Sequence, residues 1–310
     1  MIKRILAIIL AAVICVLPLA SCGGVKGSKG FTYRSNGDGT CVLVNAGTNK
    51  DRDVIIPEKS PDGDVVVAIG NGAFYKNLNI ESLTIPGTVK TIESGAFALA
   101  QLLVTVTFTG SGLETIESSA FEACYNLTSI TIPETVNTIG DYAFRICTVL
   151  TDVTVLSNTV TFGENVFNGC KKLENVNLGG TVSIGSGTFS DCVALKEIVL
   201  PNTVRTLGKY AFSGCTALES ITLSNALTIV NDWMFESCTS LKSVVVPAGV
   251  EKIGYYTFAN CTGLEAITIP STVALIDENA FYNCTAISTV TIDRNPNLVI
   301  ESGNALLGIE

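Results

Sequence analysis

Apolar and polar residues alternate in short segments that recur along this chain. In the segment SITIP, which begins at Ser129, Ile130 and Ile132 alternate with two hydroxyl residues and a proline follows. A period of two residues is typical of a β-strand with one buried face, and a proline ends strand pairing because it has no N–H to donate. The pattern therefore predicts a short strand, with Ser129 and Thr131 on the face opposite the isoleucines.

A phenylalanine recurs at steps of 22 to 24 residues and divides the chain into similar units. One unit has too little apolar surface to offset the cost of ordering its backbone, about 1 to 2 kcal/mol per residue, so neighbouring units must stack to be stable. The prediction is a β-rich solenoid of about ten to eleven units of about 23 residues. Its centre is expected to be filled by Phe74, Phe97, Phe121, Phe144, Phe167, Phe189, Phe212, Phe235, Phe258 and Phe281.

From Phe121 onward, a cysteine follows each of these phenylalanines three residues later. Metal binding is disfavoured because zinc sites use closely spaced pairs, whereas these cysteines are one whole unit apart. Disulfides between neighbours are disfavoured because side chains in register lie parallel, with Cβ atoms about 4.8 Å apart and outside the usual bridging range. We expect a ladder of small buried residues whose S–H groups reach carbonyl oxygens, formed by Cys124, Cys147, Cys170, Cys192, Cys215, Cys238, Cys261 and Cys284.

The N-terminus differs from the rest of the chain. Lys3 and Arg4 precede an apolar run over residues 5–17, and LASC follows, ending at Cys22. The run is shorter than the roughly 20 residues of a spanning helix, and the pattern resembles a bacterial lipoprotein signal. This interpretation makes residues 1–21 a signal peptide, Cys22 the lipidated residue that holds the protein on the membrane, and residues 22–30 a flexible tether.

The remainder divides into a cap, a solenoid and a closing unit. Residues 31–53 hold two strand-like segments around the turn sequence SNGDG, which predicts a hairpin that covers the first coil. The unbroken repeat over residues 54–292 indicates one elongated domain, and residues 293–310 form a degenerate last unit.

Charge and composition exclude several functions. After removal of the signal peptide the chain has 17 basic and 28 acidic side chains, a net charge of −11, and no basic stripe for nucleic acid. The chain has no histidine, which removes histidine-dependent catalysis and the commonest metal ligand. No glycine-rich phosphate loop is present. We therefore predict no catalytic residues, no metal and no cofactor.

Two surfaces are candidates for ligand binding. Tyr210, Trp233 and Tyr256 occupy the same place in three successive units, two residues before the phenylalanine, and Tyr142 holds that place earlier in the chain. Such aromatic side chains can bind a ligand, or they can pack as a rim on the adjacent coil. The polar strand face is the other candidate, or it is an ordinary solvated surface; it includes Ser129, Thr131, Ser220 and Thr222.

The motifs IGxxAFxxC and LxxIxIP, together with the period, resemble the BspA-like leucine-rich repeats of bacterial surface proteins. The resemblance covers residues 54–292 and implies an exported, surface-attached protein that binds other macromolecules, often as an adhesin. It carries over no catalytic residues. The resulting hypothesis is a lipid-anchored protein on the bacterial cell surface that binds a protein or glycan ligand. The alternatives are a structural envelope spacer and a lipoprotein that captures a substrate without being an adhesin; an enzyme is disfavoured.

Overall fold

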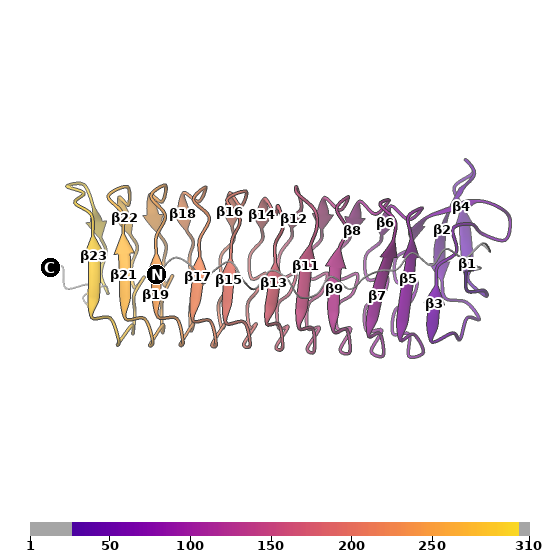
Figure 1. The fold of residues 1–310 in the computed structure, drawn as a ribbon, viewed down its shortest axis with the longest axis horizontal. Helices are drawn as coiled ribbons and strands as arrows, with labels where there is room; N and C mark the ends of the chain where they lie inside the picture. Colours follow the sequence, from indigo (N-terminus) through magenta and orange to yellow (C-terminus); the bar gives the residue numbers. More distant parts are fainter. Residues whose placement is uncertain (1–26, 304–310) are drawn as a thin grey trace, which may run out of the picture.

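The chain folds into a rod of stacked coils, described over residues 27–303 by a computed structural model (Figure 1). The rod has about eleven turns of about 23 residues, which confirms the predicted solenoid. The proposed signal peptide, Cys22 and the end of the closing unit, residues 304–310, lie outside the described residues.

The odd-numbered strands from β3 onward form one row along the rod (Figure 1). Consecutive strands pair in parallel, and the row consists of four hydrogen-bonded sheets, with breaks after β7, β13 and β17. These strands carry the alternating pattern, so their apolar side chains face the core. Their bounds are β3 (Asp53–Ile55), β5 (Ser82–Pro86), β7 (Thr105–Thr109), β9 (Ser129–Ile132), β11 (Asp152–Val155), β13 (Asn175–Asn177), β15 (Glu197–Val199), β17 (Ser220–Thr222), β19 (Ser243–Val245), β21 (Ala266–Ile269) and β23 (Thr289–Ile292).

The even-numbered strands form the opposite wall, and most contain only two residues. They begin with a pairing of β2 (Thr40–Asn45) and β4 and continue in parallel along the rod, with one break between β16 and β18. Their bounds are β4 (Val65–Ile69), β6 (Thr91–Ile92), β8 (Thr115–Ile116), β10 (Thr138–Ile139), β12 (Thr161–Phe162), β14 (Ser183–Ile184), β16 (Thr206–Leu207), β18 (Ile229–Val230), β20 (Lys252–Ile253), β22 (Leu275–Ile276) and β24 (Val299–Ile300).

A hairpin lies at the N-terminal end of the described rod. Strands β1 (Thr32–Ser35) and β2 (Thr40–Asn45) pair antiparallel around the predicted turn. The ring of Phe31, just before β1, packs edge-on against Phe74, with ring centroids 5.8 Å apart. The hairpin thus covers the first ring of the core.

The recurring phenylalanines form a continuous ladder between the two walls. All ten rings from Phe74 to Phe281 are buried, and neighbouring rings are nearly parallel. The ring of Phe212 lies 5.4 Å from that of Phe189 and 5.7 Å from that of Phe235, measured between centroids. Backbone hydrogen bonds also join neighbouring coils along the rod: the N–H of Phe212 donates to the carbonyl oxygen of Met234 in the next coil at 2.9 Å. Each coil is therefore stabilised mainly by its two neighbours.

The cysteines form a second buried ladder beside the phenylalanines. Each of the eight sulfur atoms lies within hydrogen-bonding distance of the carbonyl oxygen of the phenylalanine in the preceding coil, as in the 3.0 Å contact from Cys261 Sγ to Phe235 O. None of them is joined to another cysteine among the described residues. Burial raises the pKa of Cys147 and of Cys215 to about 12. These thiols are therefore protonated and poorly nucleophilic at neutral pH.

We expect the ladder thiols to be unreactive toward a thiol reagent at pH 8 in the folded protein, because they are buried and protonated. Denaturant without reductant should then expose most of the eight. Few reactive thiols after complete unfolding would show that the ladder is bridged.

Candidate ligand-binding surfaces

The polar strand face lies on the odd-numbered row. Ser129 and Thr131 on β9, and Ser220 and Thr222 on β17, are all exposed. The two pairs belong to one face of the rod, but three strands separate them, so they do not form a compact cluster. The structure therefore offers a long hydroxyl-bearing surface there, and not a pocket.

Carboxylates and amides occupy the strands between these pairs. A shallow depression crosses β11, β13 and β15, with Asp152, Asn177 and Glu197 in its lining. Asn175 Nδ2 donates to Asp152 Oδ1 at 2.8 Å. This region presents mainly hydrogen-bond acceptors and negative charge, a surface suited to polar contacts with an extended ligand.

Tyr210, Trp233 and Tyr256, which we call the aromatic column, lie next to one another along the rod. The centroid of the Trp233 ring is 5.0 Å from that of Tyr210 and 6.1 Å from that of Tyr256, and the rings are parallel within 11° and 4°. Tyr210 is 39% exposed, whereas Trp233 and Tyr256 are half-buried. The column therefore packs between coils, as a rim would, and still presents aromatic surface to solvent.

The backbone at the aromatic column is in the left-handed region. Trp233 has a φ of 51°, and Tyr210 and Tyr256 have φ of 58° and 51°. A residue with a Cβ is disfavoured there by about 1 to 2 kcal/mol. The strand register places this position in every coil of the rod, with positive φ throughout: Gly72, Gly95, Ser119, Tyr142, Asn165, Gly187, Tyr210, Trp233, Tyr256, Asn279 and Gly303.

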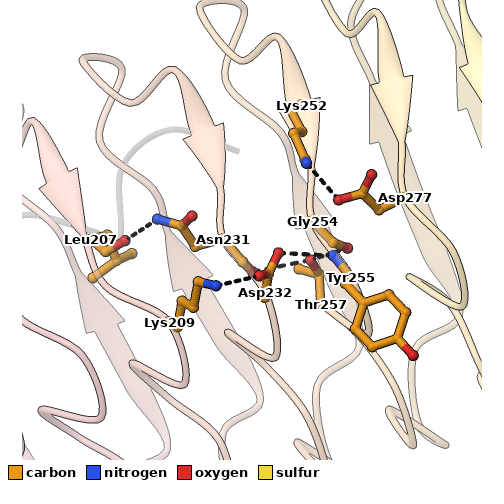
Figure 2. A network of polar contacts seen from close by, with 9 residues as sticks. All are labelled: Leu207, Lys209, Asn231, Asp232, Lys252, Gly254, Tyr255, Thr257 and Asp277. Carbon is orange, nitrogen blue, oxygen red and sulfur yellow. Dashed lines mark hydrogen bonds and ion pairs between the residues drawn. The ribbon is translucent and has the colours of Figure 1, made fainter.

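A polar network fixes the residues that immediately precede the aromatic column (Figure 2). Asp232 lies at its centre: Oδ2 pairs with Lys209 Nζ at 2.8 Å, and Oδ1 accepts from the N–H of Tyr255 at 3.1 Å. The hydrogen bond to Asp232 raises the pKa of Lys209. A Cβ on Gly254 would lie 2.7 Å from the backbone nitrogen of Asp232, so the close approach of these coils requires glycine there. The network thus links the three turns that carry the column.

Two further tyrosines belong to this aromatic region, and the sequence analysis did not select them. Tyr255 packs edge-on against Trp233, at 5.0 Å between centroids, and against Tyr256 at 4.4 Å. Tyr282 is 51% exposed and lies 5.9 Å from Tyr256. Tyr255 is adjacent to the column in sequence, which could have indicated it. Tyr282 lies one residue after the last phenylalanine of the ladder, and its approach to Tyr256 follows only from the stacking of the coils.

Comparison with known families decides the classification. The family described as BspA type leucine rich repeat region matches residues 67–192 and 182–302, with six copies. The chain belongs to this BspA-type leucine-rich repeat family. Solenoids of stacked repeats present extended surfaces that typically bind other molecules, and this BspA-type protein has the same architecture.

Several solved structures are similar to the BspA-type protein. A leucine rich cell surface protein from Faecalibacterium prausnitzii is 25% identical, with 86% of this chain and 94% of that chain covered and a TM-score of 0.41. A leucine-rich repeat protein from Bacteroides ovatus is 24% identical, with 89% and 90% covered and a TM-score of 0.42. The pneumococcal vaccine antigen PcpA is 19% identical, with 88% and 85% covered and a TM-score of 0.44. Among curated proteins, none matches this chain.

Membrane-spanning helices and metal sites are features that residues 27–303 do not contain. No helix in this part of the chain has the length and apolar character needed to cross a membrane. Within the same residues, no group of three or more histidine, cysteine, aspartate or glutamate side chains is arranged to hold a metal ion.

Proposed function

We propose that this BspA-type protein is a lipid-anchored binding protein displayed on the bacterial cell surface, where it captures a protein or glycan ligand, as an adhesin does. The family and its repeat architecture support binding. The lipoprotein-like sequence ending at Cys22 supports the anchor.

The main support for a binding role is that the aromatic column has large aromatic residues at left-handed backbone positions. Three left-handed residues with side chains cost roughly 3 to 6 kcal/mol together, whereas two stacked ring pairs contribute about 1 to 3 kcal/mol. The aromatic residues of the column therefore carry a backbone cost that glycine at the same position avoids. Glycine holds the same position at Gly72 and Gly95 without that cost. Large aromatic side chains at strained, partly exposed positions are typical of binding sites, which is why we place the ligand here.

We expect Trp233→Asn to weaken ligand binding about tenfold or more, because it removes the central anchor of the column. Asparagine is the matched replacement, since Asn165 and Asn279 hold the same left-handed position in this chain. The measurement is binding of the full-length protein to immobilised surface extracts of host and bacterial cells. Thr222→Ala, on the exposed strand face, should change that binding less than twofold.

Thermal unfolding of the same variants separates binding from packing. Trp233→Asn should leave the melting temperature close to that of the unmodified protein, whereas Phe235→Ala, which empties the core two residues away, should lower it strongly. An equal loss of stability in both variants would show that the column is core packing and would end the binding role proposed for it. An envelope spacer would bind none of the extracts.

A further inference from the structure

Charged side chains of alternating sign follow the odd-numbered row of strands, each one directly before a strand. The backbone holds them at equivalent places in successive coils: the N–H of Glu219 donates to the carbonyl oxygen of Lys196, and that of Lys242 donates to the carbonyl oxygen of Glu219. All of these side chains are exposed. We call them the charge row, which consists of Glu174, Lys196, Glu219, Lys242 and Glu265.

A row without charge runs beside it on the outer face of the same strands. Val199 on β15 and Val245 on β19 are 65% and 68% exposed, more than the other large hydrophobic side chains that the structure describes. Thr222 on β17 is in register with Val199, and Thr268 on β21 is in register with Val245. The neutral row continues at Thr131, Thr154 and Asn177 before Val199 and at Thr291 after Thr268.

The two rows belong to one surface. Glu174, Glu197 and Val199 line the shallow depression that crosses β11, β13 and β15. Glu174, Lys196 and Glu219 line a second depression beside it. The rod is nearly straight, and its odd-numbered strands lie side by side along one face (Figure 1). This face therefore offers a long surface to a partner of similar shape.

The charge row is complementary to itself in the reverse direction. If a two-fold axis runs along the strands between β15 and β17, the second copy lies antiparallel, and β15 of each copy faces β17 of the other. Lys196 then faces Glu219 of the second copy, and Glu174 faces Lys242 of the second copy. A shift of one copy by a single coil places like charges opposite each other, so the charges select the register.

The other side chains at the centre of the face are compatible with this arrangement. Val199 meets Thr222 of the second copy, and the methyl groups of both are removed from water. Glu197, the carboxylate nearest the axis on β15, faces Ser220 of the second copy, whose hydroxyl group can donate a hydrogen bond. Because the axis is two-fold, each of these contacts occurs twice.

We propose that the odd-numbered face from β9 to β23 binds a second copy of this chain, antiparallel and face to face. Strands β1 and β23 lie at opposite ends of the rod (Figure 1), so the N-terminal ends of such a pair point away from each other. Copies anchored near their N-termini on two facing membranes would meet in this way. The role that follows is contact between cells that carry the same protein, and it rests on the surface display proposed above.

The size of the face predicts a weak pair. Eight coils about 4.8 Å apart, with strands of three or four residues, give a contact of roughly 38 Å by 10 to 13 Å. This is about 400 to 500 Å² per copy, below the roughly 800 Å² of a standard interface. An axis between β17 and β19 also brings opposite charges together, but it covers six strands instead of eight. Attachment therefore requires many pairs between the same two surfaces.

The test uses full-length protein reconstituted into phosphatidylcholine vesicles, whose clustering is followed by light scattering. Vesicles that carry the unmodified protein should cluster. Lys196→Glu and Glu219→Lys should each reduce clustering at least tenfold when all vesicles carry the same variant, because each substitution places like charges opposite each other beside the axis. Thermal unfolding checks that both variants remain folded.

Mixing the two variants distinguishes contact between copies from an effect within one rod. When vesicles with Lys196→Glu meet vesicles with Glu219→Lys, the pairs beside the axis again have opposite charges, and clustering should recover to within threefold of that of the unmodified protein. Alternation also avoids repulsion between neighbouring coils of one rod, but a second molecule cannot restore that effect.

Lys90→Glu is the matched control. It also places a like charge beside a neighbour, since Lys90 Nζ lies 3.9 Å from Glu114 Oε1, but Lys90 directly precedes β6 on the opposite wall. This substitution should leave clustering within twofold of that of the unmodified protein.

The outcomes separate this proposal from the broader one. Clustering that is unchanged in both single variants, or that mixing does not restore, would overturn the antiparallel pairing. Absence of clustering by the unmodified protein, with capture of surface extracts retained, would overturn the second copy as partner and leave the proposed function in place. Clustering without capture of any extract would support the pairing and overturn the ligand binding proposed for the aromatic column.

Discussion

Phe212→Ala is expected to lower the free energy of unfolding by about 3 to 5 kcal/mol, because it empties the centre of a packed coil. Phe212 is fully buried and its ring is in contact with the rings of Phe189 and Phe235. Neighbouring coils are the main source of stability for each coil, so the damage should centre on the units that contain these two rings. Chemical denaturation measures the size of the effect, and hydrogen exchange measures its location.

Tyr125→Ala is the control for Phe212→Ala, because it also removes an aromatic ring but from a side chain that is 37% exposed. Tyr125→Ala should lower the free energy of unfolding by less than about 1 kcal/mol. Uniform loss of hydrogen-exchange protection along the whole rod in the Phe212 variant would contradict the local, coil-by-coil stability.

Cys22→Ala is expected to release the protein from the membrane. Two or three acyl chains, at about 0.8 kcal/mol per buried methylene, would hold the lipidated protein firmly, and Cys22 is the anchoring residue that the sequence predicts. Cells labelled with a fatty-acid analogue should incorporate it into the unmodified protein and not into this variant. Membrane fractionation should show the corresponding shift to the soluble fraction.

Cys15→Ala is the matched control, because it removes another cysteine of the same leader and retains Cys22. It should leave labelling and membrane attachment unchanged. Label that persists in Cys22→Ala would refute the lipoprotein hypothesis, whatever the result for ligand binding.

Much of the fold could be predicted from residues within one unit. The alternation in the segment from Ser129 to Ile132 predicts strand β9, and the structure places that strand there. The spacing of the phenylalanines predicts that they occupy equivalent positions in successive coils, because similar units stack with equivalent residues in register. The turn sequence between β1 and β2 predicts the hairpin.

The even-numbered strands, which form the opposite wall, could not be predicted from the sequence. Strands such as β10 (Thr138–Ile139) contain only two residues, too few to show a period. Their parallel pairing depends on neighbouring coils that hold each pair in register. Here the local pattern predicted only that the chain turns back.

The sequence by itself determined the repeat, the buried side of each long strand and the members of the phenylalanine and cysteine ladders, because these depend on residue type and spacing within the unit. Only the tertiary structure decided how the exposed residues combine. The stacking of Trp233 on Tyr210 and the approach of Tyr282 to Tyr256 arise when successive coils are superposed about one strand spacing apart. Contacts between coils join residues about 23 positions apart, and no local pattern encodes them.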